Sequence, residues 1–422
     1  MEASGQISAT ASITFSCPPR CIRSSHTKAI FINTACIHYN IRYMIIGLNG
    51  QNLTASKPAG PERYAINVYK NLGKIDKTNI YRLYLSEKPK KGSEISDLAN
   101  FSNFEIKLIK KRFSWTHTDL GIELLKNPVD VFFTPVHTVP FMKPLRTKYV
   151  AMIHGLEYKS NKIYSGVSMK GLLHPFILKY VTSVSDKIIV PSEFTKTALV
   201  NSKLVNNIKK ISVIHEGVGE EFYPRKNEET VSVKEKYNLS GKEYVLTVST
   251  IQPRKNIPNL VKSFSEVIRD AGLKDTLLVI SGKKGWEYQE SIDAPAKFNI
   301  SGNVKFLDWI PQEDLPALIS GAAAYINVSV EEGFGLTVLE AMACGTSVII
   351  SDIPAHREIG STYCVYVNPH DTPGIAAAIR DVLLQPERGG ITEPAKDYAN
   401  SFSWEKTARE TLDIFTSLVK RP

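Results

Sequence analysis

The chain has 422 residues, of which 43% are hydrophobic and 22% are charged, as expected for a folded protein of about two domains. Its net charge of +10 favours anionic partners, which could be nucleotide phosphates, an anionic membrane surface or nucleic acid. We find no apolar run of the roughly 18 residues that a membrane-spanning helix needs, no zinc-type Cys/His spacing and no nucleic-acid motif, so these classes are disfavoured.

Residues 1–43 differ from the rest in being rich in Ser, Thr and Ala, with one acidic residue, Glu2, against four basic ones. An organelle transit peptide has this composition. A mis-assigned start codon also explains it, because the first domain-like strand begins near Met44. We expect this extension to be disordered or non-native. The odd set of five cysteines disfavours a disulfide framework and favours a reducing compartment: Cys17, Cys21, Cys36, Cys344 and Cys364.

The first half of the chain alternates short apolar strands with helical segments. Strands are predicted at 43–48, 80–85, 104–109, 131–133 and 149–153, and helices after Gly60 and at 119–126. Strands that alternate with helices indicate a parallel sheet covered on both faces.

Polar residues follow two of these strands. His154 follows the strand 149–153, at the kind of strand end where α/β proteins bind ligands, although a lone histidine is more often structural. Ser192 and Glu193 follow the strand 186–190, and Ser192 is well placed to cap the next helix.

A basic cluster, Lys107 and residues 110–112, precedes Phe113 and Trp115. Cations beside aromatic residues can rest on an anionic membrane. A solvated loop is the alternative, and the sequence slightly favours it.

The second half opens with a strand at 244–249, and the adjacent cations Arg254 and Lys255 lie on the loop that follows. They could be solvated. A departing nucleoside diphosphate, however, needs such cationic stabilisation.

The segment 324–350 is predicted as strand, glycine loop, helix and strand. Gly333 and Gly335 permit close approach of a ligand, and the helix that follows offers free amides to phosphate. Glu332 and Glu340 can accept hydrogen bonds from sugar hydroxyls. Phosphate and hydroxyl groups together indicate a sugar nucleotide.

The string 331–345 resembles the E-x7-E signature of retaining glycosyltransferases of family four, with Glu332 and Glu340 at its ends and Gly333-Phe334-Gly335 between. The string 253–256, Pro-Arg-Lys-Asn, is similar to the family's diphosphate-binding loop. The resemblance covers about residues 44–420. It implies an α/β protein with the GT-B fold, in which two Rossmann-like, doubly wound parallel-sheet domains face each other across a cleft.

The resemblance also implies roles for single residues. Glu332 and His154 would be catalytic, although Gly155 stands where the family usually has aspartate, which bears on an acid–base role for His154. Ser192 and Glu193 would face the interdomain cleft. The donor-binding residues would be Arg254, Lys255, Gly333, Phe334, Gly335, Leu336, Thr337, Glu340 and, in an altered glycine loop, Gly60.

We therefore predict an extension at 1–43, an acceptor-side domain at 44–224, a linker at 225–241, a donor-binding domain at 242–400 and a helix at 401–422 that crosses back to the first domain. No cofactor or divalent metal is expected, because the Asp-x-Asp signature of metal-dependent glycosyltransferases is absent.

The predicted function is retaining transfer of a hexose, with mannose from GDP-mannose favoured, to a glycan or lipid-linked acceptor in cell-envelope polysaccharide synthesis. The alternatives are a UDP-sugar transferase for glucose or N-acetylglucosamine, a GT-B-fold sugar-nucleotide epimerase and a non-catalytic sugar-nucleotide-binding protein. A nucleic-acid partner is not expected. The predicted location is cytoplasmic, with peripheral contact at the inner face of the membrane as an option.

Overall fold

The computed structural model describes residues 30–32, 35–37, 43–55, 57–156, 169–205, 207–384 and 393–419. The chain divides into two compact units, Met1–Tyr43 and Met44–Pro422. In the first unit, β1 (Ile30–Ile32) pairs antiparallel with β2 (Ala35–Ile37). Most of the extension predicted at 1–43 lies outside the described residues.

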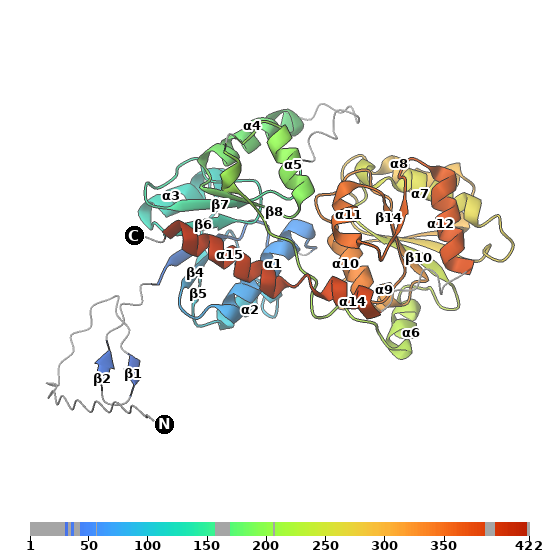
Figure 1. The fold of residues 1–422 in the computed structure, drawn as a ribbon, viewed down its shortest axis with the longest axis horizontal. Helices are drawn as coiled ribbons and strands as arrows, with labels where there is room; N and C mark the ends of the chain where they lie inside the picture. Colours follow the sequence, from blue (N-terminus) through green and yellow to red (C-terminus); the bar gives the residue numbers. More distant parts are fainter. Residues whose placement is uncertain are drawn as a thin grey trace, which may run out of the picture. The chain divides into compact units, whose positions relative to one another are not determined.

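The second unit contains two parallel sheets (Figure 1). The first has seven strands in the order β5-β4-β3-β6-β7-β8-β9. Its strands are β3 (Ile45–Asn49), β4 (Ile80–Leu85), β5 (Phe104–Leu108), β6 (Val131–Thr134), β7 (Lys148–Met152), β8 (Lys187–Val190) and β9 (Ile211–Val213). The predicted strands agree with β3 to β7 to within two residues at each end. The runs of β3, β6 and β7 are apolar and mostly buried, as strands inside a parallel sheet are, whereas β5 is an edge strand with exposed Glu105 and Lys107.

Helices cover both faces of this first sheet. One face packs against α1 (Gly60–Ile75) and α15 (Trp404–Val419), and the other against α3 (Leu120–Lys126) and α4 (Met169–Val184). The remaining helices are α2 (Glu94–Asp97) and α5 (Glu193–Asn201), with one π-helical turn, η2 (Trp115–Asp119), directly before α3. The predicted helix 119–126 therefore begins one residue later than expected, at the end of that turn.

The second sheet has six parallel strands in the order β12-β11-β10-β13-β14-β15. They are β10 (Tyr244–Val248), β11 (Leu277–Ser281), β12 (Val304–Leu307), β13 (Ala324–Asn327), β14 (Val348–Ser351) and β15 (Val365–Val367). Two buried clusters fill its two faces. The helices beside it are α7 (Ile257–Val267), α8 (Gln289–Lys297), α9 (Leu315–Ser320), α10 (Leu336–Ala343), α11 (Pro354–Gly360) and α12 (Thr372–Leu384).

The segment predicted as a linker, 225–241, is partly helical. It contains α6 (Asn227–Lys236), and its Val233 and Leu239 are buried in a core cluster of the second sheet. The two apolar side chains of this charged helix, Val231 and Val233, are too few to show periodicity, so its packing was missed. The domain boundaries remain predictions.

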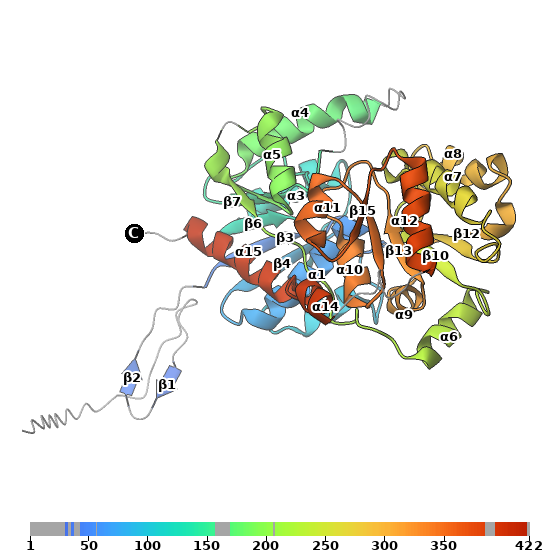
Figure 2. The same cartoon turned by 45° about the vertical axis from the view of Figure 1, so that its right-hand side comes forward.

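The chain returns to the first sheet through α14 (Glu393–Asn400) and α15. The backbone N–H of Val218 donates to the carbonyl oxygen of Phe402, 2.6 Å away. α15 then lies along α1, and the Phe415 ring is 5.4 Å from that of Phe133 on β6 (Figures 1 and 2). Among the described helices, none is long and apolar enough to cross a membrane.

Candidate active site

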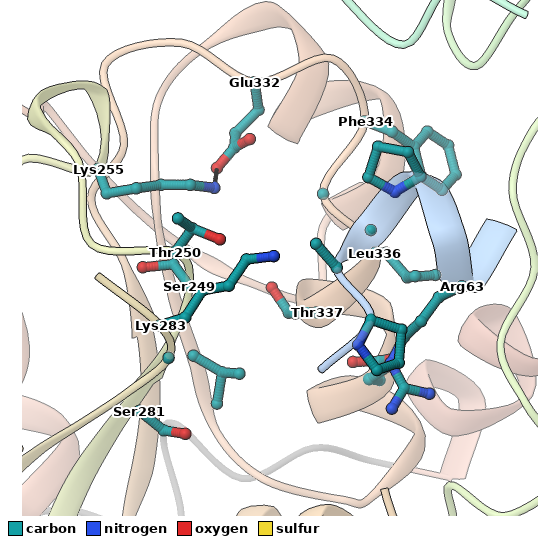
Figure 3. A pocket seen from close by; sticks show the side chains of 18 of the residues that line it. Arg63, Ser249, Thr250, Lys255, Ser281, Lys283, Glu332, Phe334, Leu336 and Thr337 are labelled. Carbon is teal, nitrogen blue, oxygen red and sulfur yellow. Dashed lines mark hydrogen bonds and ion pairs between the residues drawn. The ribbon is translucent and has the colours of Figure 1, made fainter. Parts of the chain in front are cut away.

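A cavity of about 410 Å³ lies at the carboxyl ends of strands from both sheets. From the first sheet it is lined by the start of α1, by His154 after β7 and by Glu216 after β9; from the second, by the loops that follow β10, β11, β12 and β13. Strand ends of parallel sheets are the usual ligand sites of α/β folds, because backbone groups and helix N-termini converge there. Figure 3 shows side chains that line this cavity.

The two sheets approach each other most closely at Gly333. A Cβ atom built at this residue would overlap the carbonyl oxygen of His154, so only glycine fits. The hydroxyl groups of Ser192 and Thr195 both donate to the carbonyl oxygen of Gly333, at 2.6 and 3.0 Å. Gly335 has a φ of +115°, a left-handed conformation that favours glycine at the N-cap of α10.

Glu332 is 7% exposed and is surrounded by hydrogen-bond donors. Its carboxylate pairs with the guanidinium of Arg254 at 2.6 Å and with the ammonium of Lys255, and accepts a hydrogen bond from the Ser329 hydroxyl at 2.8 Å. The Lys255 contact is visible as the dashed line in Figure 3. The loop after β10 therefore delivers both cations to the loop after β13.

These partners fix the charge of Glu332. Burial by itself would raise the pKa of this carboxyl, but the charges of Lys255 and Arg254, and then of His356, outweigh burial and hold its pKa well below the usual value. Glu332 is therefore an ionised carboxylate at neutral pH.

Glu340 is the fifth residue of α10, just over one turn from its start, and its environment is the opposite. It is 4% exposed, and within the described residues no hydrogen bond reaches its carboxylate. Burial raises the pKa of Glu340 to about 7, while the charge of Arg63 partly opposes the rise and Glu221 and Glu216 add to it. A carboxyl group in this state gains from hydroxyl donors that enter the cavity.

His154 uses both ring nitrogens within the protein. Nδ1 lies 3.0 Å from Oε1 of Glu216, and Nε2 lies 2.9 Å from the carbonyl oxygen of Pro135. A carbonyl oxygen only accepts hydrogen bonds, so Nε2 must carry a proton. Nδ1 faces the carboxylate of Glu216 at hydrogen-bond distance. In this arrangement neither ring nitrogen presents a free lone pair to the cavity.

The side chains of Ser192 and Glu193 point in different directions, although both residues were predicted to face the interdomain cleft. The hydroxyl of Ser192 accepts from the amide of Thr195 as the N-cap of α5 and also reaches Gly333. The carboxylate of Glu193 turns back to Lys196 on its own helix, 3.0 Å away. Neither side chain lines the cavity.

The other predicted residues all line the cavity, in different ways. The ring of Phe334 lies against His215, with ring centroids 5.8 Å apart, so it belongs to the seam between the sheets. Thr337 accepts a hydrogen bond from the hydroxyl of Tyr325 at 2.7 Å. Gly60 and Leu336 line the cavity from the first positions of α1 and α10.

Three further lining residues were not predicted as site residues: Arg63, Lys283 and Trp309. Arg63 and Lys283 add two cations, from α1 and from the loop after β11 (Figure 3). The indole N–H of Trp309 donates to the carbonyl oxygen of Pro58, 3.2 Å away, and joins the two sides of the cavity. Lys283 and Trp309 come just after predicted strands, and this position in the sequence could have identified them as site residues.

The part of the chain that the structure describes contains no group of three or more His, Cys, Asp or Glu residues able to hold a metal ion.

Two glycines of the cavity provide a matched test of the seam. We expect Gly333→Ala to lower the free energy of unfolding by about 1–3 kcal/mol, because its Cβ forces the loop away from His154. Gly60→Ala should change it by less than about 0.5 kcal/mol, because no atom lies within 4 Å of the new Cβ. Urea unfolding at equilibrium measures both. Equal effects would contradict the close approach at Gly333.

The raised pKa of Glu340 predicts a pH-dependent stability. Its pKa in the folded protein, about 7, lies above the ordinary 4.5, so its contribution is most favourable below pH 4.5 and is lost as the pH rises through 7. Glu340→Gln removes this loss. Relative to the wild type, the variant should gain about 3 kcal/mol of unfolding free energy between pH 4.5 and 8, at about 1.4 kcal/mol per pH unit. If the difference in unfolding free energy between the variant and the wild type does not vary with pH, the raised pKa of Glu340 is refuted.

Comparison with known proteins finds similar chains. The family model described as "Glycosyl transferases group 1" matches residues 231–399. O-antigen chain mannosyltransferase B of Escherichia coli is 31% identical over 199 residues, which are 47% of this chain and 52% of the relative. O-antigen chain mannosyltransferase RfbU of Salmonella typhimurium is 29% identical over 60% of this chain and 65% of its own length. The chain thus spans about half to two thirds of these relatives.

Among solved structures, Anabaena Alr3699/HepE, in complex with UDP and glucose, superposes with a TM-score of 0.70. The match covers 89% of this chain and all of the other, at 16% identity, and is therefore evidence for the fold alone. Residues 231–399 are thus similar to the group 1 glycosyl transferases, and the chain has the GT-B fold.

Proposed function

We propose that this protein is a retaining glycosyltransferase of family four that transfers a hexose from a nucleotide sugar to a glycan or lipid-linked acceptor in cell-envelope polysaccharide synthesis. The observation that carries the proposal is the buried group of Glu332, Arg254 and Lys255 at the wall of a cavity between two sheets. Mannose from GDP-mannose is the favoured donor, because the relatives named above are O-antigen mannosyltransferases.

In this proposal the donor diphosphate binds Arg254, Lys255 and the first amides of α10. Arg can engage phosphate oxygens through two donors, and Lys acts as a point charge. Both cations are held by Glu332 in the ligand-free protein. A bound diphosphate would compete for them and leave the Glu332 carboxylate available to the transferred sugar.

The buried carboxyl of Glu340 would accept hydrogen bonds from the ribose hydroxyls. Because burial raises its pKa to about 7, part of the protein has a neutral Glu340 at physiological pH. The neutral form also avoids repulsion from the donor phosphates.

Catalysis would rest on positioning and charge stabilisation. The bond from the anomeric carbon to the diphosphate oxygen breaks, a bond from the same carbon to the acceptor oxygen forms on the same face, and the proton of the acceptor hydroxyl passes to the departing diphosphate. Arg254 and Lys255 stabilise the charge that grows on the departing diphosphate, and ionised Glu332 stabilises the cationic character of the sugar. In other glycosyltransferases a divalent metal stabilises the departing diphosphate. Because Arg254 and Lys255 would do so here, we propose that no metal is required.

The acceptor would bind on the side of the first sheet, near His154. Its pair with Glu216 fits a hydrogen-bonding role better than that of a general base, because both ring nitrogens are engaged. We propose that this reaction takes place in the cytoplasm, because the odd number of cysteines favours a reducing compartment.

The first experiment is a thermal-shift panel of GDP-mannose, UDP-glucose, UDP-N-acetylglucosamine, ADP-glucose, GDP and UDP, each with and without magnesium. Stabilisation by guanine nucleotides, equal without metal, supports the favoured donor. Stabilisation by uridine nucleotides assigns a UDP-sugar transferase instead. Release of nucleoside diphosphate only when acceptor is present separates a transferase from an epimerase and from a binding protein. The anomeric configuration of the product, read by NMR, tests retention.

Glu332→Gln tests the central residue. The amide keeps the shape but loses the charge, so we expect turnover to fall by about a hundredfold or more while the far-UV circular dichroism spectrum is unchanged. Glu313→Gln, at an exposed carboxylate of the second domain, removes the same charge and should retain normal turnover. Near-normal activity of the Glu332 variant would rule out its catalytic role.

A further inference from the structure

The first domain carries exposed apolar side chains that its own core does not use. Phe113, Leu145 and Phe176 are 73%, 104% and 69% exposed, and Phe141 and Met142 are also exposed. They come from the loop after β5, from the loop between β6 and β7, and from α4. We define these five residues as the apolar surface. Exposed apolar residues that gather in this way mark an interaction site.

Direct contacts connect the segments of this surface. The ring of Phe141 stacks on His117 with centroids 4.5 Å apart, and meets the edge of Tyr180 at 5.7 Å. The Tyr180 hydroxyl also donates to the carbonyl oxygen of Phe141, 2.8 Å away. Phe176 precedes Tyr180 by one helical turn, so it lies on the same side of α4. The loop and the helix therefore form one continuous face.

Phe113 is held beside this face by the same π-helical turn that contains His117. The carboxylate of Asp119, in that turn, accepts hydrogen bonds from the amides of Arg112 and Phe113 at 3.0 and 3.1 Å. Trp115, expected to join Phe113 in a membrane contact, does not: it is 5% exposed, and its indole N–H donates to the carbonyl oxygen of Ile109. The exposed aromatic partners of Phe113 come from distant segments instead.

The charges around the apolar surface are unbalanced. All five acidic side chains of segments 104–148 and 175–186 already have partners: Glu105 with Arg82, Glu123 with Lys107, Asp186 with Lys143 and Lys148, Asp119 with the two amides above, and Asp130 with the amide of Ile45. Six exposed cations of the same segments have no ion pair in the described part of the chain: Lys110, Lys111, Arg112, Lys126, Arg146 and Lys179. The segments that carry the apolar side chains therefore have an excess of unpaired positive charge in the described part of the chain.

This combination selects one kind of partner. An anionic lipid surface accepts apolar side chains into its interface and attracts nearby cations, each by about 1 kcal/mol. A second copy of this chain would bring the same unneutralised cations face to face and be repelled. We propose that the apolar surface, with its six cations, docks the protein on a membrane that contains anionic lipid.

The position of the surface is consistent with the cavity. The loop that carries Phe113 follows the carboxyl end of β5, at the sheet edge where the cavity opens, and Thr116 just beyond it is hydrogen-bonded to Gln51, which follows β3. Docking itself does not depend on the proposed function. If that function holds, the membrane would present a lipid-linked acceptor at this edge.

The test is flotation of the full chain with vesicles of phosphatidylcholine alone and with vesicles that are about one-third phosphatidylglycerol. We expect binding to the anionic vesicles that weakens with salt. Phe113→Ser with Phe176→Ser, and separately Lys110→Ala, Lys111→Ala and Arg112→Ala together, should each weaken it by about tenfold or more.

Matched controls lie elsewhere on the chain. Val231→Ser with Leu384→Ser removes exposed apolar side chains, and Lys262→Ala, Lys274→Ala and Lys297→Ala together remove the same charge from the second domain. Both should bind as the wild type does. Equal binding to neutral vesicles, no binding to anionic vesicles, or equal losses in the control variants would overturn the proposal. It would also be overturned if the chain does not bind vesicles but self-associates in sedimentation velocity, and the Phe113 and Phe176 changes abolish that self-association. A failed thermal-shift panel would leave this result unaffected.

Discussion

The backbone contact at Gly333 is the constraint on which the cavity depends. The loop after β13 approaches His154 so closely that no side chain fits, and two hydroxyl groups from Ser192 and Thr195 hold its carbonyl oxygen. The same loop carries Glu332 one residue earlier, and α10 begins three residues later. One glycine thus positions a carboxylate and the amides of a helix N-terminus against groups from the other sheet.

Within that frame the two glutamates of one motif have different charge states. Glu332 lies beside Arg254 and Lys255, which hold its pKa low, whereas burial raises the pKa of Glu340 to about 7. Both are buried, so the difference arises from the neighbouring charges: Lys255 and Arg254 outweigh burial at Glu332, whereas at Glu340 Arg63 opposes burial only in part and Glu221 and Glu216 add to it. In the proposed reaction this separation suits an ionised carboxylate near the sugar and a hydroxyl acceptor near the ribose.

Much of the fold and site followed from local patterns. Apolar runs predicted five strands of the first sheet, and a glycine loop before a helix predicted where phosphate could bind, because strand ends and helix N-termini are readable from sequence. The packing of α6 could not be predicted, since a charged helix with few apolar residues resembles a linker. Arg63 and Trp309 were missed as site residues because their side chains meet the cavity only after the two sheets come together.

The sequence by itself determined the alternation of strands and helices and the motif 331–345, since both depend on residues that are near in the chain. Only the tertiary structure decided which charges meet. Arg254 and Glu332 are 78 residues apart, and His154 and Glu216 are 62 apart, yet each pair is within hydrogen-bond distance. It also decided that Trp115 is buried while Phe113, Phe141 and Phe176 are exposed. Burial and pairing are properties of packed surfaces, and local patterns do not contain them.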